Sequence, residues 1–467
     1  MRFFLILLLL STTALAQLAR QTQSSNTTES LRGVSAVSQQ IAWASGTHGT
    51  YLRTTDAGRT WIPAQVPNAT TLDFRGVVAF SADEAFLMSA GPGDQSRIYH
   101  TSDAGQHWQL QFTATNPKSF FDSIVFWDNA HGIVLGDPIP DETSKETGKD
   151  SGQLKFQLLI TDDGHTWTPI PPSQLPPAFE GEGAFAASNS CLAILHTAST
   201  LAENNHSAKS VILSGDSSSV ERSACRSRRT LCNLPSPEAS QGILTGDLLT
   251  STAQLSLASW KSGAEASAPR TPKEKEGASA SEESDPNIWF ATGGKVARVF
   301  HSPDRGRTWQ VFTTLLAHGP DSVGIFSIAF RDANHGVIAG GDYKHPDQDG
   351  PNLAFTNDGG KTWSLSRIFP QSYYSAVAYD RQSITALSFR PKHSVAESNA
   401  TSQLDDNQAR VRLFLASPKF MYDFRPPKDP TRISPPKKSG IQFNAVSPYP
   451  TGGALFVGPK GSIATIP

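Results

Sequence analysis

The 467-residue sequence predicts an all-β fold, a seven-bladed β-propeller of four-stranded antiparallel blades. One observation is a segment of the form Ser/Thr-x-Asp-x-Gly-x-Thr-Trp that recurs five times along the chain, with Ile160 and His107 as departures from it. A second is that short runs of strand-forming residues stand ahead of these segments. Units of four strands in about 40–50 residues, with Trp and Gly at fixed offsets, are typical of propeller blades.

The recurring segments, which we call boxes, begin at Thr54, Thr101, Ile160, Ser302 and Thr356. The Asp of a box can accept hydrogen bonds from the backbone N–H groups of its own turn, and the Gly two residues later can adopt a positive φ. The Trp can cover the turn with apolar area. We therefore expect tight hairpins, and favour a structural role over acid–base catalysis for Asp56, Gly58, Trp61, Asp103, Gly105, Trp108, Asp162, Gly164, Trp167, Asp304, Gly306, Trp309, Asp358, Gly360 and Trp363.

The first strand of each unit is expected to line a central channel. These strands begin at Gly33, Gly76, Ser123, Gly183, Ser327, Ser375 and Asn444, which gives seven units. In the fourth unit, residues 183–187 are the expected inner strand and residues 288–291 the second strand. The last unit shows three strands, and a fourth could come from residues 18–30, although their polar composition is poor for a strand.

Composition divides the chain into three other parts besides the blades. Residues 202–286 are rich in Ser, Ala, Glu and Lys, and cannot bury enough apolar surface to offset the entropy of ordering them. We predict that they form a disordered insertion in blade four of a propeller spanning residues 31–467. Residues 1–16 are predicted to be a signal peptide, and residues 17–30 an N-terminal tail.

The signal peptide is predicted from Arg2, the apolar run 3–10 and the small residues Ala14 and Ala16 near a cleavage site. The apolar run is too short to span a bilayer as a helix, so we expect an exported protein that is periplasmic or extracellular and does not cross the membrane. The 40 Lys+Arg against 42 Asp+Glu give a net charge of −2, which argues against a nucleic-acid binder.

The boxes resemble the Asp-box (BNR) repeat of sialidases, sortilin-type receptors and photosystem II stability/assembly factors. The segment Trp43-Ala-Ser-Gly46-Thr-His-Gly49-Thr50 is similar to the lead of the assembly-factor blades. This resemblance implies a non-enzymatic seven-bladed propeller that assists assembly of a membrane complex, without implying a photosystem as the client. We expect a monomer without cofactor or metal, whose partner is a protein, a membrane-complex subunit.

Sialidases resemble one another in a Phe-Arg-Ile-Pro segment, which this chain lacks; Phe74-Arg75-Gly76 and Phe389-Arg390-Pro391 share only two residues with it. The enzymatic alternative is a glycoside hydrolase with a divergent site, in which Asp122 and Glu182 would be the paired carboxylates. A third possibility is a propeller that binds carbohydrate without catalysis.

A binding site is expected where the inner strands begin, at one mouth of the channel. The residues just before these strands are Arg32, Arg75, Asp122, Glu182, Phe326, Tyr374 and Phe443. Arginines suit carboxylates and aromatic residues suit apolar anchors, so this ring favours a peptide or protein loop. Alternatively, the charged members pair with one another. The same face should carry Asp137 and Asp342, as turn-stabilising carboxylates or as ligand contacts.

Overall fold

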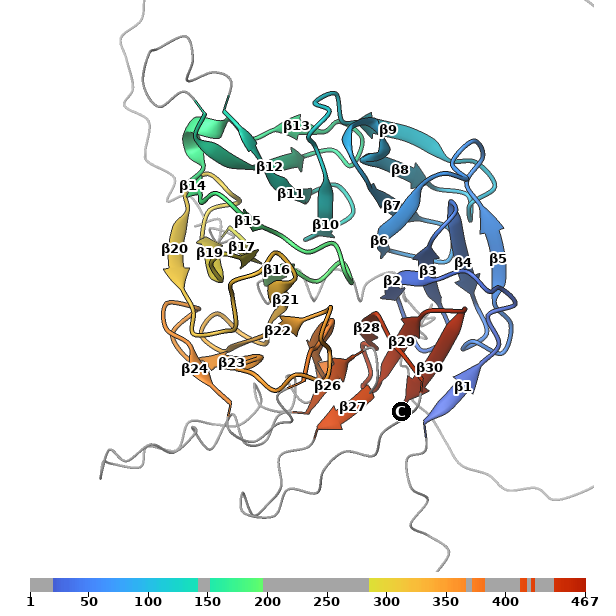
Figure 1. The fold of residues 1–467 in the computed structure, drawn as a ribbon. Coiled ribbons are helices and arrows are strands. Elements are labelled where there is room, and N and C mark those ends of the chain that lie inside the picture. The colour runs from blue at the N-terminus through green and yellow to red at the C-terminus, as the bar shows by residue number, and fades with distance from the viewer. Residues whose placement is uncertain are drawn as a thin grey trace, which may run out of the picture. The chain divides into compact units, whose positions relative to one another are not determined.

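The structure is a computed structural model that describes residues 20–141, 152–195, 285–366, 372–382, 412–417, 421–424 and 441–467. These residues form seven antiparallel sheets that surround a central axis like the blades of a propeller (Figure 1). The predicted signal peptide, and all but the last two residues of the predicted insertion 202–286, lie outside the described residues. Within the described ranges, no helix is long and apolar enough to cross a membrane.

The sheets are numbered here in chain order. Sheet 1 contains β2 (Leu31–Ala36), β3 (Ala42–Gly46), β4 (Thr50–Thr54) and β5 (Ile62–Gln65). Sheet 2 contains β6 (Asp73–Ala79), β7 (Ala85–Ala90), β8 (Arg97–Thr101) and β9 (Gln109–Thr113). Sheet 3 contains β10 (Phe121–Phe126), β11 (Gly132–Pro140), β12 (Leu154–Thr161) and β13 (Thr168–Pro169). Sheet 4 contains β16 (Leu192–Leu195), β17 (Asn287–Ala291), β19 (Arg298–Ser302) and β20 (Gln310–Thr313). Sheet 5 contains β21 (Val323–Phe330), β22 (Gly336–Asp342), β23 (Leu353–Thr356) and β24 (Ser364–Leu365). Sheet 6 contains β25 (Ala376–Tyr379), β26 (Leu413–Ala416) and β27 (Met421–Phe424). Sheet 7 contains β28 (Ala445–Pro448), β29 (Ala454–Gly458), β30 (Ser462–Ile466) and β1 (Gln21–Gln23).

Three short strands extend these sheets: β14 (Pro177–Ala178) pairs with β12, and β15 (Glu182–Gly183) joins β21 through β18 (Gly293–Gly294). Two single 3-10 turns complete the elements, η1 (Gly93–Gln95) and η3 (Pro172–Gln174). Six sheets contain a four-stranded antiparallel blade, and sheet 6 has three strands among the described residues. The prediction of an all-β propeller with four-stranded antiparallel blades is therefore confirmed.

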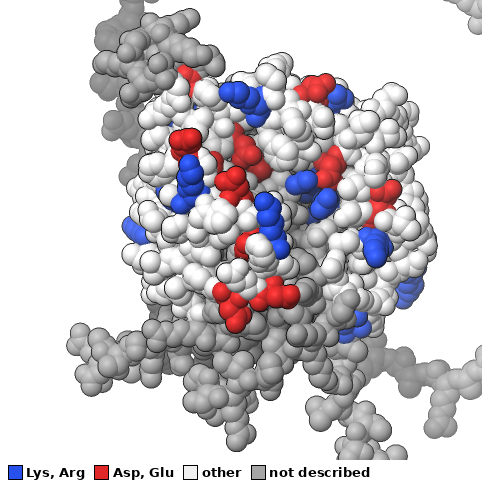
Figure 2. Space-filling model, in the orientation of Figure 1, with Lys and Arg blue, Asp and Glu red and all other residues white. Residues whose placement is uncertain are grey.

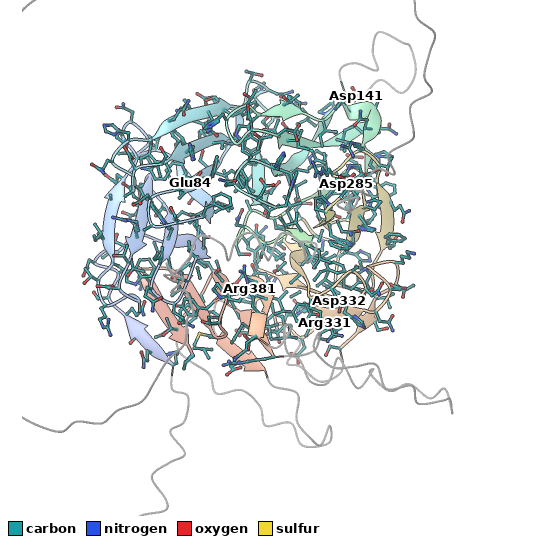
Figure 3. The ribbon with its side chains drawn as sticks, turned by 180° about the vertical axis from the view of Figure 1, so that it is seen from behind. Glu84, Asp141, Asp285, Arg331, Asp332 and Arg381 are labelled. Atoms are coloured by element: carbon teal, nitrogen blue, oxygen red, sulfur yellow. The ribbon has the colours of Figure 1, made fainter. Side chains whose placement is uncertain are left out.

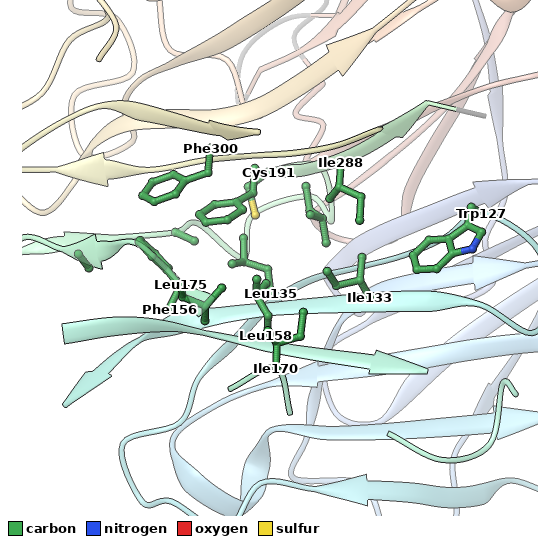
Figure 4. Packing of buried hydrophobic residues seen from close by; sticks show 14 residues of the cluster. Trp127, Ile133, Leu135, Phe156, Leu158, Ile170, Leu175, Cys191, Ile288 and Phe300 are labelled. Atoms are coloured by element: carbon green, nitrogen blue, oxygen red, sulfur yellow. The ribbon is translucent and has the colours of Figure 1, made fainter. Parts of the chain in front are cut away.

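The first strands of the sheets form a closed ring, in which β2, β6, β10, β16, β21, β25 and β28 each contact the next and β28 contacts β2. Because neighbouring sheets cover both faces of a sheet, every residue of the second strand β7 is buried. Apolar clusters fill the space between sheets. Between sheets 3 and 4, Ile133 and Leu135 of β11 pack with Ile288 of β17 and Phe300 of β19 (Figure 4).

The boxes connect the third and fourth strands of sheets 1 to 5. In the first box, Thr54 Oγ1 donates to Asp56 Oδ1 at 2.9 Å, and the same oxygen accepts the Thr60 N–H at 2.9 Å. The Gly58 N–H donates to Thr54 Oγ1, and Gly58 has a φ of 77°, which a side chain would strain. The second, fourth and fifth boxes repeat these bonds around Asp103, Asp304 and Asp358.

The third box is built around Asp163, whereas the sequence predicted Asp162. Thr161 Oγ1 donates to Asp163 Oδ1 at 3.1 Å, and the Thr166 N–H donates to the same oxygen at 2.6 Å. The reason is a shorter turn: Gly164 donates to a hydroxyl three residues earlier, whereas the other boxes use four. Thr161 therefore supplies the hydroxyl that Ile160 lacks, and the prediction for Asp162 was wrong.

Sheet 4 differs from the predicted fourth unit. Its inner strand is β16, which pairs with β17. The predicted inner strand 183–187 lies outside this sheet, and only its first residue, Gly183, is in a strand, as the last residue of β15. Residues 184–191, which we call the channel strap, run between β15 and β16 toward the central axis (Figure 1). The small-apolar pattern of 183–187 matches an inner strand, but its Phe185 instead stacks on Phe326 of the neighbouring sheet.

The N-terminal segment closes the ring. Residues 21–23, predicted as part of a tail, form β1 and pair antiparallel with β30 as the outer strand of sheet 7. The Gln23 side chain accepts the Trp61 indole N–H at 2.9 Å and donates to the Ala57 backbone carbonyl oxygen at 3.1 Å. A polar segment can form this strand because its backbone pairs with the outer edge of β30 and the Gln23 side chain binds polar groups in the box of sheet 1.

Candidate channel-mouth site

The inner strands place the predicted ring residues at β-bulges. The pairing of β2 with β3 shifts register between Leu31 and Gly33, so Arg32 has no partner in the ladder. The same shift occurs at Arg75 in β6, at Asp122 in β10 and at Phe326 in β21. Because a bulge redirects the side chain of its extra residue, one backbone irregularity sets the direction of all four side chains.

Two of these arginines share one carboxylate. Arg75 Nε donates to Asp73 Oδ2 at 2.9 Å, and Arg32 Nε lies 3.5 Å from Asp73 Oδ1. Asp73 precedes Arg75 by two residues on β6, and the hydrogen bond between them shows that the two side chains lie on the same side of the strand. This spacing is the sequence signal that could have identified Asp73, which the ring prediction missed.

The guanidinium of Arg32 is held less firmly than that of Arg75. Its side chain is 31% exposed, and Arg32 Nε has no hydrogen-bond partner within the described part of the chain. Arg75 is more firmly held, because its Nη1 also donates to the Ala186 backbone carbonyl oxygen at 3.2 Å. Two guanidiniums thus share the Asp73 carboxylate at this side of the mouth.

Beside the arginines lie two carboxyl groups, the buried Asp122 and the partly buried Asp137. Asp122 is 1% exposed, and neither carboxylate oxygen has a hydrogen-bond partner in the described residues. Burial and, second, the nearby Asp137 raise the pKa of Asp122 well above its usual range, while Arg75 opposes the shift. Burial raises the pKa of Asp137 to about 6, against the opposing bond from the Ala184 N–H.

Asp137 and Asp342 take different roles, although the sequence places them at matching positions. Asp137 accepts the N–H of Ala184 in the channel strap at 2.9 Å. Asp342 instead caps its own turn, where it accepts the Lys344 N–H at 2.9 Å and contacts His345 Nδ1 at 2.7 Å. Only Asp137 therefore contributes to the channel mouth.

Glu182 is committed to a buried ion pair. Its two oxygens accept from Arg298 Nε and Nη2 at 2.8 and 2.5 Å, and Oε1 also accepts the Thr292 hydroxyl at 2.7 Å. The carboxyl group that acts on Asp122 is that of Asp137. The geometry thus departs from the pairing of Asp122 with Glu182 that the hydrolase alternative required, because Arg298 of β19 draws Glu182 away.

The aromatic ring members lie inside the protein. Tyr374 and Phe443 are fully buried in the apolar clusters that flank β25, and Phe326 is 2% exposed. Phe326 stacks on Phe185 of the channel strap, with 3.8 Å between ring centroids and 14° between planes. These side chains face neighbouring sheets, so as placed here they cannot serve as exposed anchors.

Charged groups of both signs gather around the middle of the face drawn in Figure 2. The opposite face, seen in Figure 3, carries the turns between first and second strands, where Glu84 and Asp332 lie. The box of sheet 2 meets such a turn, since the Ala104 N–H donates to the Asp83 carbonyl oxygen. Among the described residues, no three His, Cys, Asp or Glu side chains are grouped closely enough to hold a metal ion.

No protein-family model matches the chain, and no curated protein matches it. Solved structures that align with it include YCF48 bound to D1 peptide, with 14% identity, coverage of 98% of this chain and 99% of that chain, and a TM-score of 0.35. A GH74 xyloglucanase from Xanthomonas campestris aligns at 12% identity over 96% of this chain and 53% of that chain, with a TM-score of 0.46. The WD40 β-propeller domain of Doa1 aligns at 8% identity over 96% and 97%, with a TM-score of 0.46. Likenesses at this level carry no argument about function.

Proposed function

We propose that this protein is an exported, non-enzymatic propeller scaffold with one blade in each of its seven sheets, and that its channel mouth binds a segment of a protein partner. The partner we expect is a subunit of an envelope membrane complex, whose assembly or stability the scaffold assists. The seven sheets support the blade count. The resemblance of the boxes to those of assembly factors supports the kind of partner.

The observation that carries the proposal is the arginine pair at the mouth. Arg32 is partly exposed beside a carboxylate that Arg75 already occupies; its Nε is buried 3.5 Å from Asp73 Oδ1, so only its two outer nitrogens can reach a partner. A guanidinium in this state can bind a carboxylate of a partner through two parallel hydrogen bonds. The bonds that the box carboxylates make within their own turns leave them structural, which supports binding over catalysis.

The test is affinity capture of the tagged protein from the host's envelope fraction, followed by mass spectrometry. Arg32→Glu should lose the captured subunit, because a carboxylate would face the partner's carboxylate. Arg59→Glu is the matched control, since Arg59 is an exposed arginine in the first box, on the opposite face. It should retain the subunit.

Arg32→Glu loses the ion pair with Asp73 and should lower the melting temperature by no more than about 4 °C, because Arg75 still neutralises Asp73. Arg75→Glu is a poorer test than the sequence suggested, because Arg75 also holds Asp73 and Ala186 and its loss should lower stability. Equal capture by Arg32→Glu and wild type would contradict the proposal. An empty capture by well-expressed wild type would direct attention to glycan arrays and to hydrolysis assays of Asp122→Asn.

A further inference from the structure

The channel strap, residues 184–191, connects inner strands that belong to separate sheets. Asn189 pairs with Ile124 of β10 through both atoms of its amide, since Oδ1 accepts the Ile124 N–H at 2.8 Å and Nδ2 donates to the carbonyl oxygen at 3.0 Å. Ser188 Oγ donates to the Ser375 carbonyl oxygen at 2.7 Å, next to β25. The Ile328 N–H of β21 donates to the Ser190 carbonyl oxygen. The strap is thus a resident occupant of the channel mouth.

The mouth holds the strap as a site would hold an extended peptide. Asp137 accepts a backbone N–H, and Arg75 donates to a backbone carbonyl oxygen two residues farther along, at Ala186. Between these two contacts, the Phe185 ring lies flat on Phe326. Two backbone contacts flanking one aromatic anchor are the elements by which peptide segments are recognised.

The glycines beneath Phe185 make a slot for its ring. A Cβ at Gly293 would lie within van der Waals overlap of the Phe185 ring, and a Cβ at Gly324 would stand 2.8 Å from it. Both residues belong to the short ladder between β18 and β21, where they pair with each other. The backbone is therefore bare where the aromatic side chain of the strap lies.

The closed strap has an energetic cost. Asp122 is buried next to Cys191 at the end of the strap, and neither of its oxygens has a hydrogen-bond partner among the described residues; the partly buried Asp137 lies close by. Buried polar groups without partners destabilise the arrangement that buries them. Within the strap, Asn189 also has a φ of 59°, which costs a non-glycine residue energy. A strap that left the mouth would let water reach Asp122 and would relieve these costs.

We propose that the channel strap is a built-in competitor for the channel mouth, and that the partner segment displaces it. The segment that fits is an extended peptide with an aromatic side chain for the Gly293–Gly324 slot and backbone groups for Asp137 and Arg75. This inference rests on the proposed function in assuming that the mouth is the binding site. It adds the chemistry of the ligand and a gate that must open before binding.

The first test replaces residues 184–190 by a Gly/Ser stretch of equal length and supplies the native segment as a separate molecule. The probe is a fluorescein-labelled peptide with blocked ends and the sequence Gly-Ala-Phe-Ala-Ala-Ser-Asn-Ser, that of residues 183–190. Fluorescence anisotropy should show saturable binding to the replaced variant. Binding to wild type should be at least tenfold weaker, because the tethered strap competes at an effective concentration in the millimolar range.

The matched control is the same peptide with Phe185→Ala. It should bind the replaced variant at least tenfold more weakly, because it cannot fill the slot on Phe326. Equal binding of the two peptides would overturn the proposal. So would the lack of saturable binding by a variant whose melting temperature stays close to that of wild type.

A second measurement applies if the replaced variant does not fold. Cys191 is a buried free thiol at the end of the strap, so its alkylation by iodoacetamide reports opening. Asn189→Ala removes the amide pair with Ile124 and should accelerate alkylation of Cys191 at least tenfold, measured by mass spectrometry of its peptide. Asn334→Ala, an exposed asparagine in a turn on the opposite face, should leave the rate unchanged.

Alkylation of Cys191 only at the rate of global unfolding, in both variants and in wild type, would show that the strap is a fixed part of the core and would overturn the proposal. Neither strap measurement uses the partner, so its outcome is separable from that of the capture experiment. If capture depends on Arg32 and the strap never opens, the partner binds at the mouth without displacing the strap.

Discussion

Arg75 Nη1 lies 3.2 Å from the backbone carbonyl oxygen of Ala186, so a side chain from the inner strand of sheet 2 holds a segment that leads into sheet 4. The same guanidinium donates to Asp73 and lowers the cost of a negative charge on Asp122. Arg75 thus connects its neighbour Arg32, through their shared carboxylate, with Asp122 and with the channel strap. The following predictions examine the contacts around this centre and those that maintain the ring.

Asp137 should make the protein less stable as the pH rises. Its folded-state pKa is raised to about 6 by burial, so the folded protein binds a proton that the unfolded chain has released between about pH 4 and pH 6. Stability contributed by this group is therefore present at low pH and lost as the pH rises through 6. The rise in the Asp137 pKa from about 4 to about 6 corresponds to about 3 kcal/mol of unfolding free energy.

Asp137→Asn should remove that loss, because the amide is uncharged and its oxygen can still accept the Ala184 N–H. Urea unfolding from pH 4.5 to 7.5 should show that the free energy of unfolding of the variant increases relative to that of wild type as the pH rises. Parallel curves for the two proteins would mean that Asp137 titrates normally in the folded state.

Removing one partner of the Glu182–Arg298 ion pair should lower the free energy of unfolding much more than replacing both partners. Glu182→Ala leaves a buried guanidinium without its carboxylate and should lower the free energy of unfolding by about 3–5 kcal/mol. Replacing both residues by Met should cost much less, since no charge is left unpaired. Chemical denaturation measures both; an equal loss in the two variants would indicate that packing, and not the charge, dominates.

The third box should depend on Asp163 and not on Asp162. Asp163→Ala removes an acceptor for the Thr166 and His165 N–H groups and should lower the melting temperature clearly. Asp162→Ala, at the adjacent exposed position, should leave it unchanged. Differential scanning calorimetry of the two variants decides between these carboxylates, and a larger loss for Asp162→Ala would reverse the assignment.

Ring closure should depend on Gln23. Gln23→Ala loses the bonds to the Trp61 indole and the Ala57 carbonyl oxygen, which should cost about 1–2 kcal/mol of unfolding free energy. Gln21→Ala is the matched control, because Gln21 is exposed on the same strand. It should cost less than about 0.5 kcal/mol. Similar losses for both would indicate that strand pairing alone closes the ring.

Sequence patterns predicted the fold class and the turns because both depend on local chemistry. A box needs only a hydroxyl, a carboxylate and a glycine within a few residues, so its hydrogen bonds can be anticipated from spacing. The same reasoning located Arg32, Arg75 and Asp122 at equivalent positions of successive inner strands. It misplaced the third box by one residue, because a turn one residue shorter looks nearly identical in sequence.

The sequence by itself therefore determined the all-β propeller, its antiparallel blades and the approximate positions of six inner strands, since these follow from short-range periodicity. The tertiary structure alone decided which polar groups meet, because the Glu182–Arg298 ion pair and the bond from Arg75 to the Ala186 carbonyl oxygen join residues that are over 100 positions apart. It also decided that residues 184–191 enter the channel and that residues 21–23 complete sheet 7. Both segments are fixed by contacts with other sheets, and no local pattern carries that information.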